Sequence, residues 1–383
     1  MPKISFILNI CYLLLLIILP AYTFAQDTAT VSETQLYEKA RVLDVSNERV
    51  QPISGTDTPS HIQTLKIEVI SGEDIGKTPT FDNESPMQLL VGETFYVRHI
   101  HETADNIDRW SVADVYRLNV LIGIAVLFLA LLAVFGGTQG ARGLLSLIGS
   151  VLTIFYILIP LLYHGYSPIL VSIVVSLIII TLGSYVTHGW NKTTTVAVCG
   201  MFGTVIVTGL IAYYVVHAAQ LTGYSSEESV YLNFDTHGHI DMAGLLFGGI
   251  MIGLLGVLYD IAIGQAIVVE ELLGLGTQLS RRQVYVRALR VGREHIGALV
   301  NTLAIAYVGV ALPLLLLIQS STGGILFTLN SEIFATEIVR ILIGSIGLVL
   351  AVPVTTSIAA YVLPRIPHNP DSATHHGHSH VHH

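Results

Sequence analysis

The chain has 383 residues, of which 52% are hydrophobic and only 12% are charged. Soluble domains carry about 25% charged residues, so this composition, with a mean hydropathy of +0.66, argues against a soluble protein and for a polytopic membrane protein. Residues 26–117 hold 16 acidic and 8 basic residues, a net charge of −8, which argues against a nucleic-acid partner and favours a solvated domain.

The first 25 residues have the pattern of a signal peptide. Lys3 supplies a positive start, residues 10–19 form an apolar core, and the run Thr23-Phe24-Ala25 offers a cleavage site. The alternative is an uncleaved anchor helix. In either case the segment that follows, residues 26–117, is expected to be exported.

Residues 26–117 lack a long apolar run and contain three strand-like stretches, at 39–46, 63–72 and 93–101. In the second stretch, apolar and charged residues alternate, which is typical of a half-buried strand. Glycine and proline clusters separate the stretches. We therefore expect a small all-β domain, resembling a short barrel. Residues 107–119 are expected to lead into the membrane, with Trp110 and Tyr116 as interfacial anchors.

From residue 118 onward the apolar runs are long enough to cross a bilayer, because a helix needs about 20 residues to cross about 30 Å of hydrocarbon. The predicted fold class of residues 118–363 is an all-α polytopic membrane bundle of seven transmembrane helices, preceded by the exported β-domain. The fifth helix is expected to continue to about residue 271. The predicted spans are 118–136, 144–162, 168–187, 194–216, 243–263, 297–318 and 337–362.

Basic residues predict the orientation of this bundle. With the N-terminal domain outside, the cytoplasmic segments are 137–143, 188–193, 264–296 and the tail 364–383. They carry eight basic residues: Arg142, Lys192, Arg281, Arg282, Arg287, Arg290, Arg293 and Arg365. The exterior links carry none: 163–167, 217–242 and 319–336. We therefore expect a protein of the plasma (inner) membrane with a cytoplasmic C-terminus.

Several long motifs resemble those of the YibE/F family of bacterial multi-pass membrane proteins. They are AGLLFGGIMIGLLGVLYDIAIGQAIVVEEL (243–272), GREHIGALVNTLAIAYVGVALPLLLL (292–317), EIVRILIGSIGLVLAVPVTTSIAA (337–360), and, in the exported domain, ARVLDVS and LKIEVISGE. The resemblance covers nearly the whole chain after residue 35. It implies a multi-pass architecture but no reaction, because the family's biochemical role is not established. The histidine-rich tail departs from the family pattern.

One carboxylate lies inside the fifth predicted span. Asp260 follows Ala243 by 17 residues, about 25 Å along a helix, which places it in the inner third of the bilayer. A charge at the bilayer centre costs at least about 2.5–3.5 kcal/mol, and less near the interface. Two interpretations stay open: part of a cation or proton pathway, or a helix-end carboxylate paired with an arginine of residues 281–293.

Three further polar residues are candidates for the same pathway. Glu271 follows Asp260 by 11 residues, about three helical turns, so the two carboxylates share a helix face about 16 Å apart. With Glu270 they are candidates for the lining of a cytoplasmic vestibule, and the alternative is an ordinary helix end near the interface. Asn301 opens the next span, and its alternative role is a hydrogen bond across helices.

Small residues in the fifth span have the spacing of a helix-packing seam, in the pairs Gly244/Gly248 and Gly249/Gly253. The alternative is a set of backbone carbonyls exposed to a permeating ion. In the last span, Arg340 lies one turn after Glu337 and is expected to pair with it. The sequence leaves the oligomeric state open and is compatible with a homo-oligomer.

Histidines suggest two sites for a divalent metal such as zinc. In an exterior link, His237, His239 and Asp241 stand at every second position and could bind such a metal. The other interpretation is a loop that binds no metal. The tail carries seven histidines, among them His375, His376, His378 and His380, and its composition is that of a disordered metal-binding segment. Adventitious metal binding is the alternative there. No other cofactor is expected.

Motifs for common hydrolases, zinc proteases and ATP-binding loops are missing from the sequence, so we expect neither an enzyme nor an ATP-driven pump. The expected function is a secondary transporter or permease for an ion or small solute, with the bilayer as its surroundings. The alternative is a non-transporting membrane scaffold or receptor whose exported β-domain binds a partner.

Overall fold

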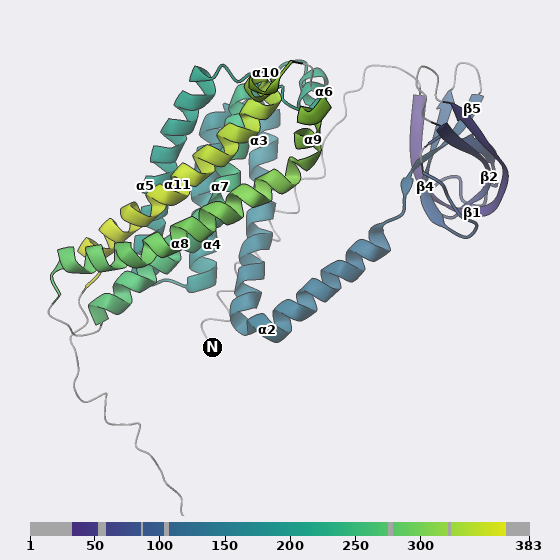
Figure 1. Ribbon diagram of the computed structural model, residues 1–383. Helices are drawn as coiled ribbons and strands as arrows, with labels where there is room; N and C mark the ends of the chain where they lie inside the picture. The colour runs from purple at the N-terminus through teal and green to yellow at the C-terminus, as the bar shows by residue number, and fades with distance from the viewer. Residues whose placement is uncertain are drawn as a thin grey trace, which may run out of the picture. The chain divides into compact units, whose positions relative to one another are not determined.

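The computed structural model describes residues 33–52, 59–85, 87–102, 107–274, 279–320 and 323–364. The described residues up to Gly136 form one compact unit, and those from Gly137 onward form a second unit (Figure 1). The predicted signal peptide (1–25) and all but the first residue of the predicted tail (364–383) lie outside the described residues.

The first unit is built on one antiparallel sheet that curls into a half-barrel (Figure 1). Its strand order is β3-β2-β1-β4-β5, and the edge strands β3 and β5 approach each other. The predicted small all-β domain is confirmed in this form. The strands are β1 (Glu33–Pro52), β2 (Pro59–Val69), β3 (Thr80–Asn83), β4 (Thr94–Glu102) and β5 (Ile107–Val115).

Alternating side chains explain this sheet. In β2, Leu65 and Ile67 are buried while Lys66 between them is exposed, and the three predicted strand-like stretches fall on β1, β2 and β4. The prediction that residues 107–119 lead directly into the membrane was wrong for residues 107–115. These residues pair with β4 as β5, and Trp110 packs against the sheet's apolar core rather than serving as a membrane anchor.

The second unit is helical. Its elements are the end of α2 (Leu118–Thr153), the π-helix η1 (Ile154–Leu158), α3 (Ile159–Tyr163), α4 (Pro168–His188), α5 (Lys192–Ala218), α6 (Glu227–Asp235), α7 (Met242–Gly274), α8 (Arg281–Val310), α9 (Leu312–Ser320), α10 (Ile325–Asn330) and α11 (Glu332–Val362). Polar caps start several of these helices. The Asn191 side chain accepts from the Thr194 N–H at α5, and Ser280 forms a capping box with Gln283 at α8.

The core of the second unit surrounds α7, which packs against α4, α5, α8 and α11. Glycines allow some of these helices to approach closely. A Cβ on Gly248 of α7 would stand 2.3 Å from Ser172 Oγ of α4, and one on Gly200 of α5 would stand 2.4 Å from Thr355 Oγ1 of α11. Small side chains are therefore required at these crossings.

Five helices are long and apolar enough to cross a membrane, or six if the bent pair α8 and α9 counts as one span. The seven predicted spans are not confirmed. The first two, 118–136 and 144–162, fall in a single stretch, Leu118–Tyr163, of 46 residues. Gly137 interrupts that stretch with φ 50° and ψ −140°, a conformation that glycine adopts readily.

The sixth predicted span, 297–318, is broken. α8 and α9 meet at a bend of 72°, two residues before Pro313, whose ring and missing N–H disfavour a continuous helix. Within the predicted cytoplasmic link 264–296, α7 continues to Gly274 and α8 begins at Arg281, so most of this link is helical. The expected pair of Glu337 and Arg340 is confirmed, with 3.0 Å between Oε1 and Nη1.

Replacing Gly200 with alanine tests the close crossing of α5 and α11. The added methyl group would collide with Thr355, so we expect Gly200→Ala to lower the free energy of unfolding by about 1–3 kcal/mol. Thermal unfolding of the purified protein in detergent measures this change. Gly256→Ala is the matched control, because nothing lies within 4 Å of its Cβ position; equal melting temperatures for the two variants would contradict the assigned crossing.

Candidate functional site

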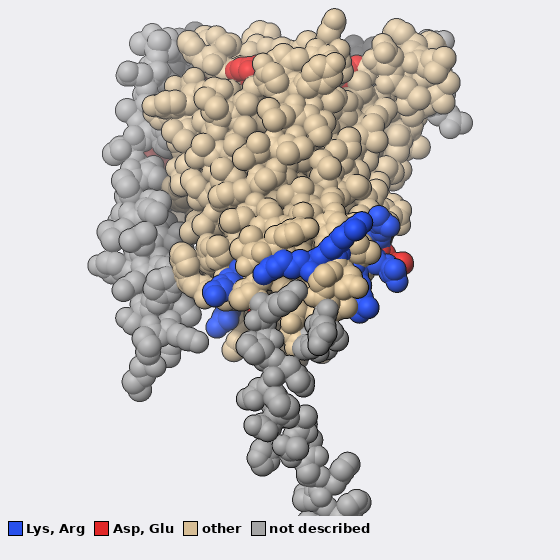
Figure 2. Space-filling model, turned by 90° about the vertical axis from the view of Figure 1, so that its left-hand side faces the viewer, with Lys and Arg blue, Asp and Glu red and all other residues tan. Residues whose placement is uncertain are grey.

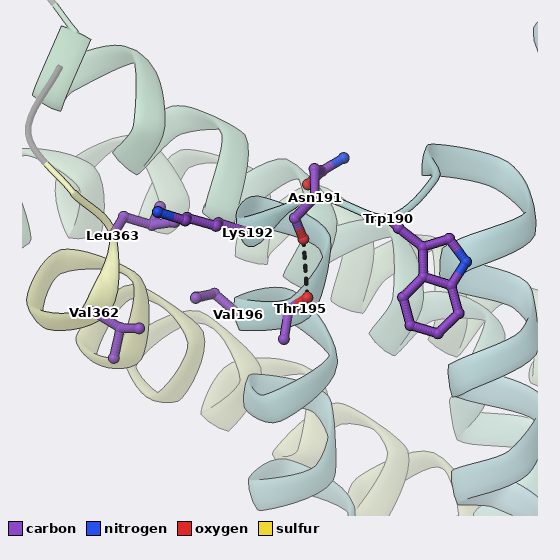
Figure 3. Close-up of a pocket in the computed structure, with 7 residues that line it drawn as sticks. All are labelled: Trp190, Asn191, Lys192, Thr195, Val196, Val362 and Leu363. Atoms are coloured by element: carbon purple, nitrogen blue, oxygen red, sulfur yellow. Dashed lines mark hydrogen bonds between the residues drawn. The ribbon is translucent and has the colours of Figure 1, made fainter.

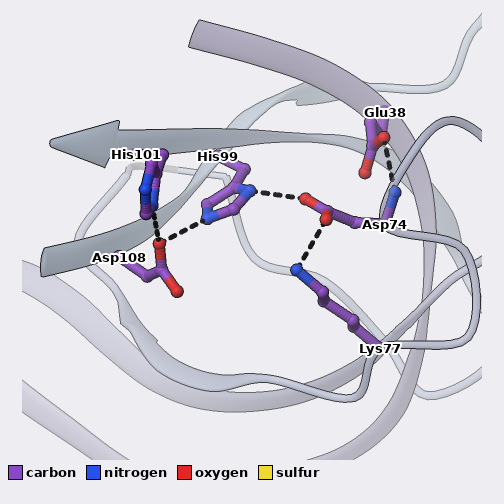
Figure 4. Close-up of polar contacts among 6 residues, drawn as sticks. All are labelled: Glu38, Asp74, Lys77, His99, His101 and Asp108. Atoms are coloured by element: carbon purple, nitrogen blue, oxygen red, sulfur yellow. Dashed lines mark hydrogen bonds and ion pairs between the residues drawn. The ribbon is translucent and has the colours of Figure 1, made fainter. Parts of the chain in front are cut away.

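A cluster of charged side chains lies on the inner face of the sheet. Along β4, Phe95 and Val97 point into the core, and the same alternation carries His99 and His101 to that side. His99 therefore occupies a position where the strand pattern calls for an apolar residue, and it is buried with 4% of its surface exposed. A buried polar side chain needs partners, and two carboxylates provide them (Figure 4).

His99 is held between Asp74 and Asp108. Its Nδ1 lies 2.5 Å from Asp74 Oδ2, and its Nε2 lies 3.2 Å from Asp108 Oδ1. The second contact is an ion-pair distance without the alignment of a hydrogen bond. The imidazole also stacks on Trp110, with ring centroids 3.8 Å apart and planes within 4°. Both ring edges and one ring face are therefore fixed.

The cluster continues on both sides of His99. Lys77 Nζ lies 2.6 Å from Asp74, and His101 Nδ1 lies 2.6 Å from Asp108 (Figure 4). Glu38 is buried beside Asp74: its Oε1 accepts from the Asp74 N–H at 3.0 Å, while its Oε2 has no hydrogen-bond partner among the described residues. A Cβ on Gly72 would collide with Glu38, so the turn that carries Asp74 requires glycine there.

The two aspartates are held in their ionised form. Burial would raise the pKa of Asp74, but hydrogen bonds from Lys77 and His99 outweigh burial and leave this pKa below its usual value. The hydrogen bond from His101, followed by the contact with His99, lowers the pKa of Asp108. The cluster thus alternates basic side chains with ionised carboxylates, in the order Lys77, Asp74, His99, Asp108 and His101.

None of the polar groups predicted from sequence belongs to this cluster. Asp260 and Glu271 are exposed on α7, together with Gly264 and Ile267 between them, so the two carboxylates do lie along one exposed stripe. Glu270 is half-buried on the same helix, and Asn301 is exposed on α8. The structure places these four residues on the outer surface of the bundle and does not bring them together around a cavity.

The interpretation of Asp260 as a helix-end carboxylate paired with an arginine is not confirmed, while its place in a cation or proton pathway stays a prediction. No arginine of residues 281–293 forms an ion pair with it in the described part of the chain. The residue before it, Tyr259, contacts α4: its ring lies 5.9 Å from the ring of His188, and its hydroxyl donates to the Gly183 carbonyl at 3.3 Å. Asp260 therefore follows directly after the contact between α7 and the C-terminal end of α4.

The glycines of α7 divide between two neighbours. Gly244 and Gly248 lie against Pro168 and Ser172 of α4, and Gly253 lies against the Tyr307 hydroxyl of α8. Gly249 faces open space. The first small-residue pair thus marks one crossing, while the second pair does not.

The predicted metal ligands do not form a site in the described chain. His237, His239 and Asp241 are exposed in the link between α6 and α7, and no group of three or more metal-ligating side chains is arranged around an ion among the described residues. The tail residues His375, His376, His378 and His380 lie outside those residues.

A second feature was missed from the sequence: buried hydroxyl groups without a partner inside the helical unit. Five of them, on α4, α5 and α11, are fully buried and have no hydrogen-bond partner in the part of the chain described: Ser176, Ser184, Thr208, Thr336 and Thr355. Two nearby threonine hydroxyls do have hydrogen-bond partners. Thr204 and Thr356 donate to the carbonyls of Gly200 and Val352 one turn earlier.

A shallow pocket of about 380 Å³ lies where α5 begins and α11 ends (Figure 3). Trp190, Asn191 and Lys192 form one side of it, and Val362 and Leu363 form the other. Trp190 stacks on Tyr185 with ring centroids 4.1 Å apart. The pocket therefore combines one cation with apolar walls at an end of the bundle.

Comparison with known proteins gives a single kind of match. The sequence model of the family described as YibE/F-like protein matches residues 124–365, which is more than half of the chain and runs from within α2 to just past the end of α11. The motifs at 243–272, 292–317 and 337–360 lie within this region. No curated protein and no solved structure matches the chain.

Asp74→Asn tests the buried row of charges. The folded-state pKa of Asp74 lies below its unfolded value of about 3.9, so the carboxylate contributes stability above about pH 4 that is lost as the pH falls through the folded pKa. We expect the variant to lose about 1–3 kcal/mol at neutral pH and to respond less to acid.

The fluorescence of Trp110 during urea unfolding of the full chain reports this change. Trp190→Phe is introduced first, because the chain has 2 tryptophans. Asp44→Asn is the control, since Asp44 is exposed on β1. Identical acid responses of Asp74→Asn and the parent would show that Asp74 is not part of a stabilising network.

Proposed function

The chain belongs to the YibE/F-like protein family, and from that premise we propose that it is a secondary transporter or permease for protons or small cations. Family membership and the long apolar helices indicate an integral membrane protein. We assign no chemical reaction, no ATP, no nucleic acid and no cofactor to this activity. Its partners are the bilayer and the transported solute.

The five unpartnered hydroxyls carry this proposal. A buried polar group without a hydrogen bond costs about 1–3 kcal/mol, and nearly all such groups in folded proteins have a partner. Thr204 and Thr356 show that hydroxyls in these same helices can be satisfied by a carbonyl of their own helix. Water molecules or a dehydrated cation passing between α4, α5 and α11 would supply the missing partners.

The hydroxyls extend through most of a bilayer. Thr336 and Thr355 are 19 positions apart on α11, about 28 Å along the helix axis, which is close to the hydrocarbon thickness of about 30 Å. Thr208 on α5 and Ser176 and Ser184 on α4 add polar groups on the neighbouring helices. Their distribution supports a path through the helical unit rather than one isolated site.

Asp260 and Glu271 are proposed to supply negative charge at one end of this path. Ser184 follows Gly183, whose carbonyl accepts the Tyr259 hydroxyl, so Asp260 lies near the second of the two unpartnered hydroxyls of α4. With basic residues on the cytoplasmic side, that end faces the cytoplasm. Glu270 and Asn301 remain candidates for the same entrance.

The proposed topology has seven spans in the plasma (inner) membrane and the β-domain outside. The break at Gly137 would divide the 46-residue stretch Leu118–Tyr163 into two crossings, and the bent pair α8 and α9 would form one. With α4, α5, α7 and α11, these crossings give the seven proposed spans.

A non-transporting scaffold or receptor is the second candidate. Its support comes from exposed apolar side chains on the loops of the sheet unit, where Ile75, Leu90 and Val91 each expose more than half of their surface. A partner docking on these loops would cover them. Reproducible recovery of a partner by the full chain, together with no flux in vesicles, would favour this function over transport.

Thr208→Val is expected to reduce flux without destabilising the protein. Valine has the shape of threonine but cannot bond a passing proton or cation, so we expect a roughly tenfold reduction. Proteoliposomes are tested for H⁺, Na⁺, K⁺ and Mg²⁺ with ion-sensitive dyes. Thr204→Val is the matched control, because the Thr204 hydroxyl is already bonded to Gly200. Equal flux in both variants would contradict the path, and no wild-type flux for any ion would contradict transport.

Asp260→Asn removes the charge proposed for the cytoplasmic entrance. We expect a lower rate for a cation and a smaller dependence of that rate on ionic strength, because the local attraction for cations is lost. The same vesicle assay measures both quantities. Asp235→Asn, on the exposed end of α6, is the control, and unchanged transport of every tested ion by Asp260→Asn would exclude this role.

A further inference from the structure

The first half of α8 is an amphipathic helix with a strongly basic outer face. Val284, Ala288 and Gly292 recur every four residues and are buried against the bundle. The exposed side carries Arg282, Arg287, Arg290 and Arg293. One acidic residue, Glu294, accompanies them.

Among the described residues, the first arginine of α8 is the one with a structural partner. Arg281 Nη1 donates to the carbonyls of Ala360 and Tyr361 at 2.7 and 2.6 Å, which ties α8 to the C-terminal end of α11. The four exposed arginines form no ion pair within the described part of the chain. Their guanidinium groups are therefore free to bind an anion from outside the protein.

These arginines belong to a wider basic band at one end of the helical unit. Figure 2 shows Lys and Arg side chains gathered across this end with an acidic side chain beside them, while other acidic side chains appear near the opposite end. From Arg281 to Arg293 the band follows α8 for 12 positions, about 18 Å. That length covers more than one phospholipid headgroup.

Apolar side chains accompany the arginines on the exposed face. On α8, Val286 and Val291 expose 48% and 40% of their surface. At the start of α5, the exposed Trp190 lines a pocket together with Lys192. A soluble phosphate anion would leave these apolar groups in water. A phospholipid satisfies both chemistries, since its phosphate meets the guanidinium groups and its acyl chains meet the apolar residues.

We propose that the basic face of α8, formed by Arg282, Arg287, Arg290 and Arg293, binds the headgroups of anionic phospholipids. Arginine binds phosphate through two parallel hydrogen bonds, and basic residues at a membrane surface attract anionic lipid. The bound lipid fixes the first half of α8 at the interface, ahead of the second half of α8 that leads to the bend with α9. This interaction does not depend on whether the protein transports a solute.

Lipid binding by the full-length protein tests this proposal. The protein in detergent is titrated with short-chain phosphatidylglycerol or phosphatidylcholine, and bound lipid is counted by native mass spectrometry. Each arginine is expected to contribute about fivefold to the affinity for the anionic lipid. The variant R287Q/R290Q/R293Q should therefore bind phosphatidylglycerol roughly 100-fold more weakly and bind phosphatidylcholine as the wild type does.

The matched control removes three exposed cations from the sheet unit, as R41Q/K66Q/R109Q, and should retain the wild-type affinity. R287K/R290K/R293K keeps the charges and should retain most of the preference, and the wild-type preference should weaken with added salt. If the glutamine variant does not fold, the lysine variant and the salt dependence of the wild type still test whether the arginines bind anionic lipid. Three results would overturn the proposal. They are an equal loss of phosphatidylglycerol affinity in R287Q/R290Q/R293Q and R41Q/K66Q/R109Q, a preference for the anionic lipid that does not change with salt, and displacement of the lipid by inorganic phosphate.

Discussion

Close packing around α7 is the constraint on which the helical unit depends. Four helices meet α7, and their crossings leave room for little more than a hydrogen atom at Gly248 or a small side chain at Ser172. Serine and threonine are small enough for such crossings but bring a hydroxyl with them. The same requirement that lets the helices approach therefore places polar groups inside an apolar bundle.

This coupling links packing to the proposed activity. Where a hydroxyl bonds to its own helix, as Thr204 does, it serves packing alone. Where it has no protein partner among the described residues, as at Thr208 one turn later, it is available to water or to a cation. Charge is then required only at the ends of the path, which agrees with the positions of Asp260 and Glu271 on the surface of α7.

The sequence predicted those features that depend on local patterns. Alternation located β1, β2 and β4, the sequence of α7 indicated a helix that continues to about residue 271, and helical spacing gave the pair of Glu337 and Arg340. The basic half of α8 was predicted only as part of a cytoplasmic link. The spacing of Val284, Ala288 and Gly292, every four residues, would have indicated a helix there. The break at Gly137 and the 72° bend before Pro313 depend on backbone angles that composition does not specify.

The candidate sites were harder to predict because they depend on contacts between distant segments. The alternation of Phe95, Val97, His99 and His101 was a usable signal for a buried histidine, but its partner Asp74 comes from the turn after β2. The unpartnered hydroxyls could not be recognised at all from sequence, because a buried threonine with a bond and one without a bond look alike until their neighbours are placed.

The central claim is that the five buried hydroxyls line a hydrated path. The most direct measurement is a cryo-electron microscopy map of the protein in lipid nanodiscs, at a resolution that shows ordered water. We expect density for water or an ion within hydrogen-bonding distance of most of Ser176, Ser184, Thr208, Thr336 and Thr355. A dry interior in which each of these hydroxyls bonds to a carbonyl of its own helix would contradict the claim.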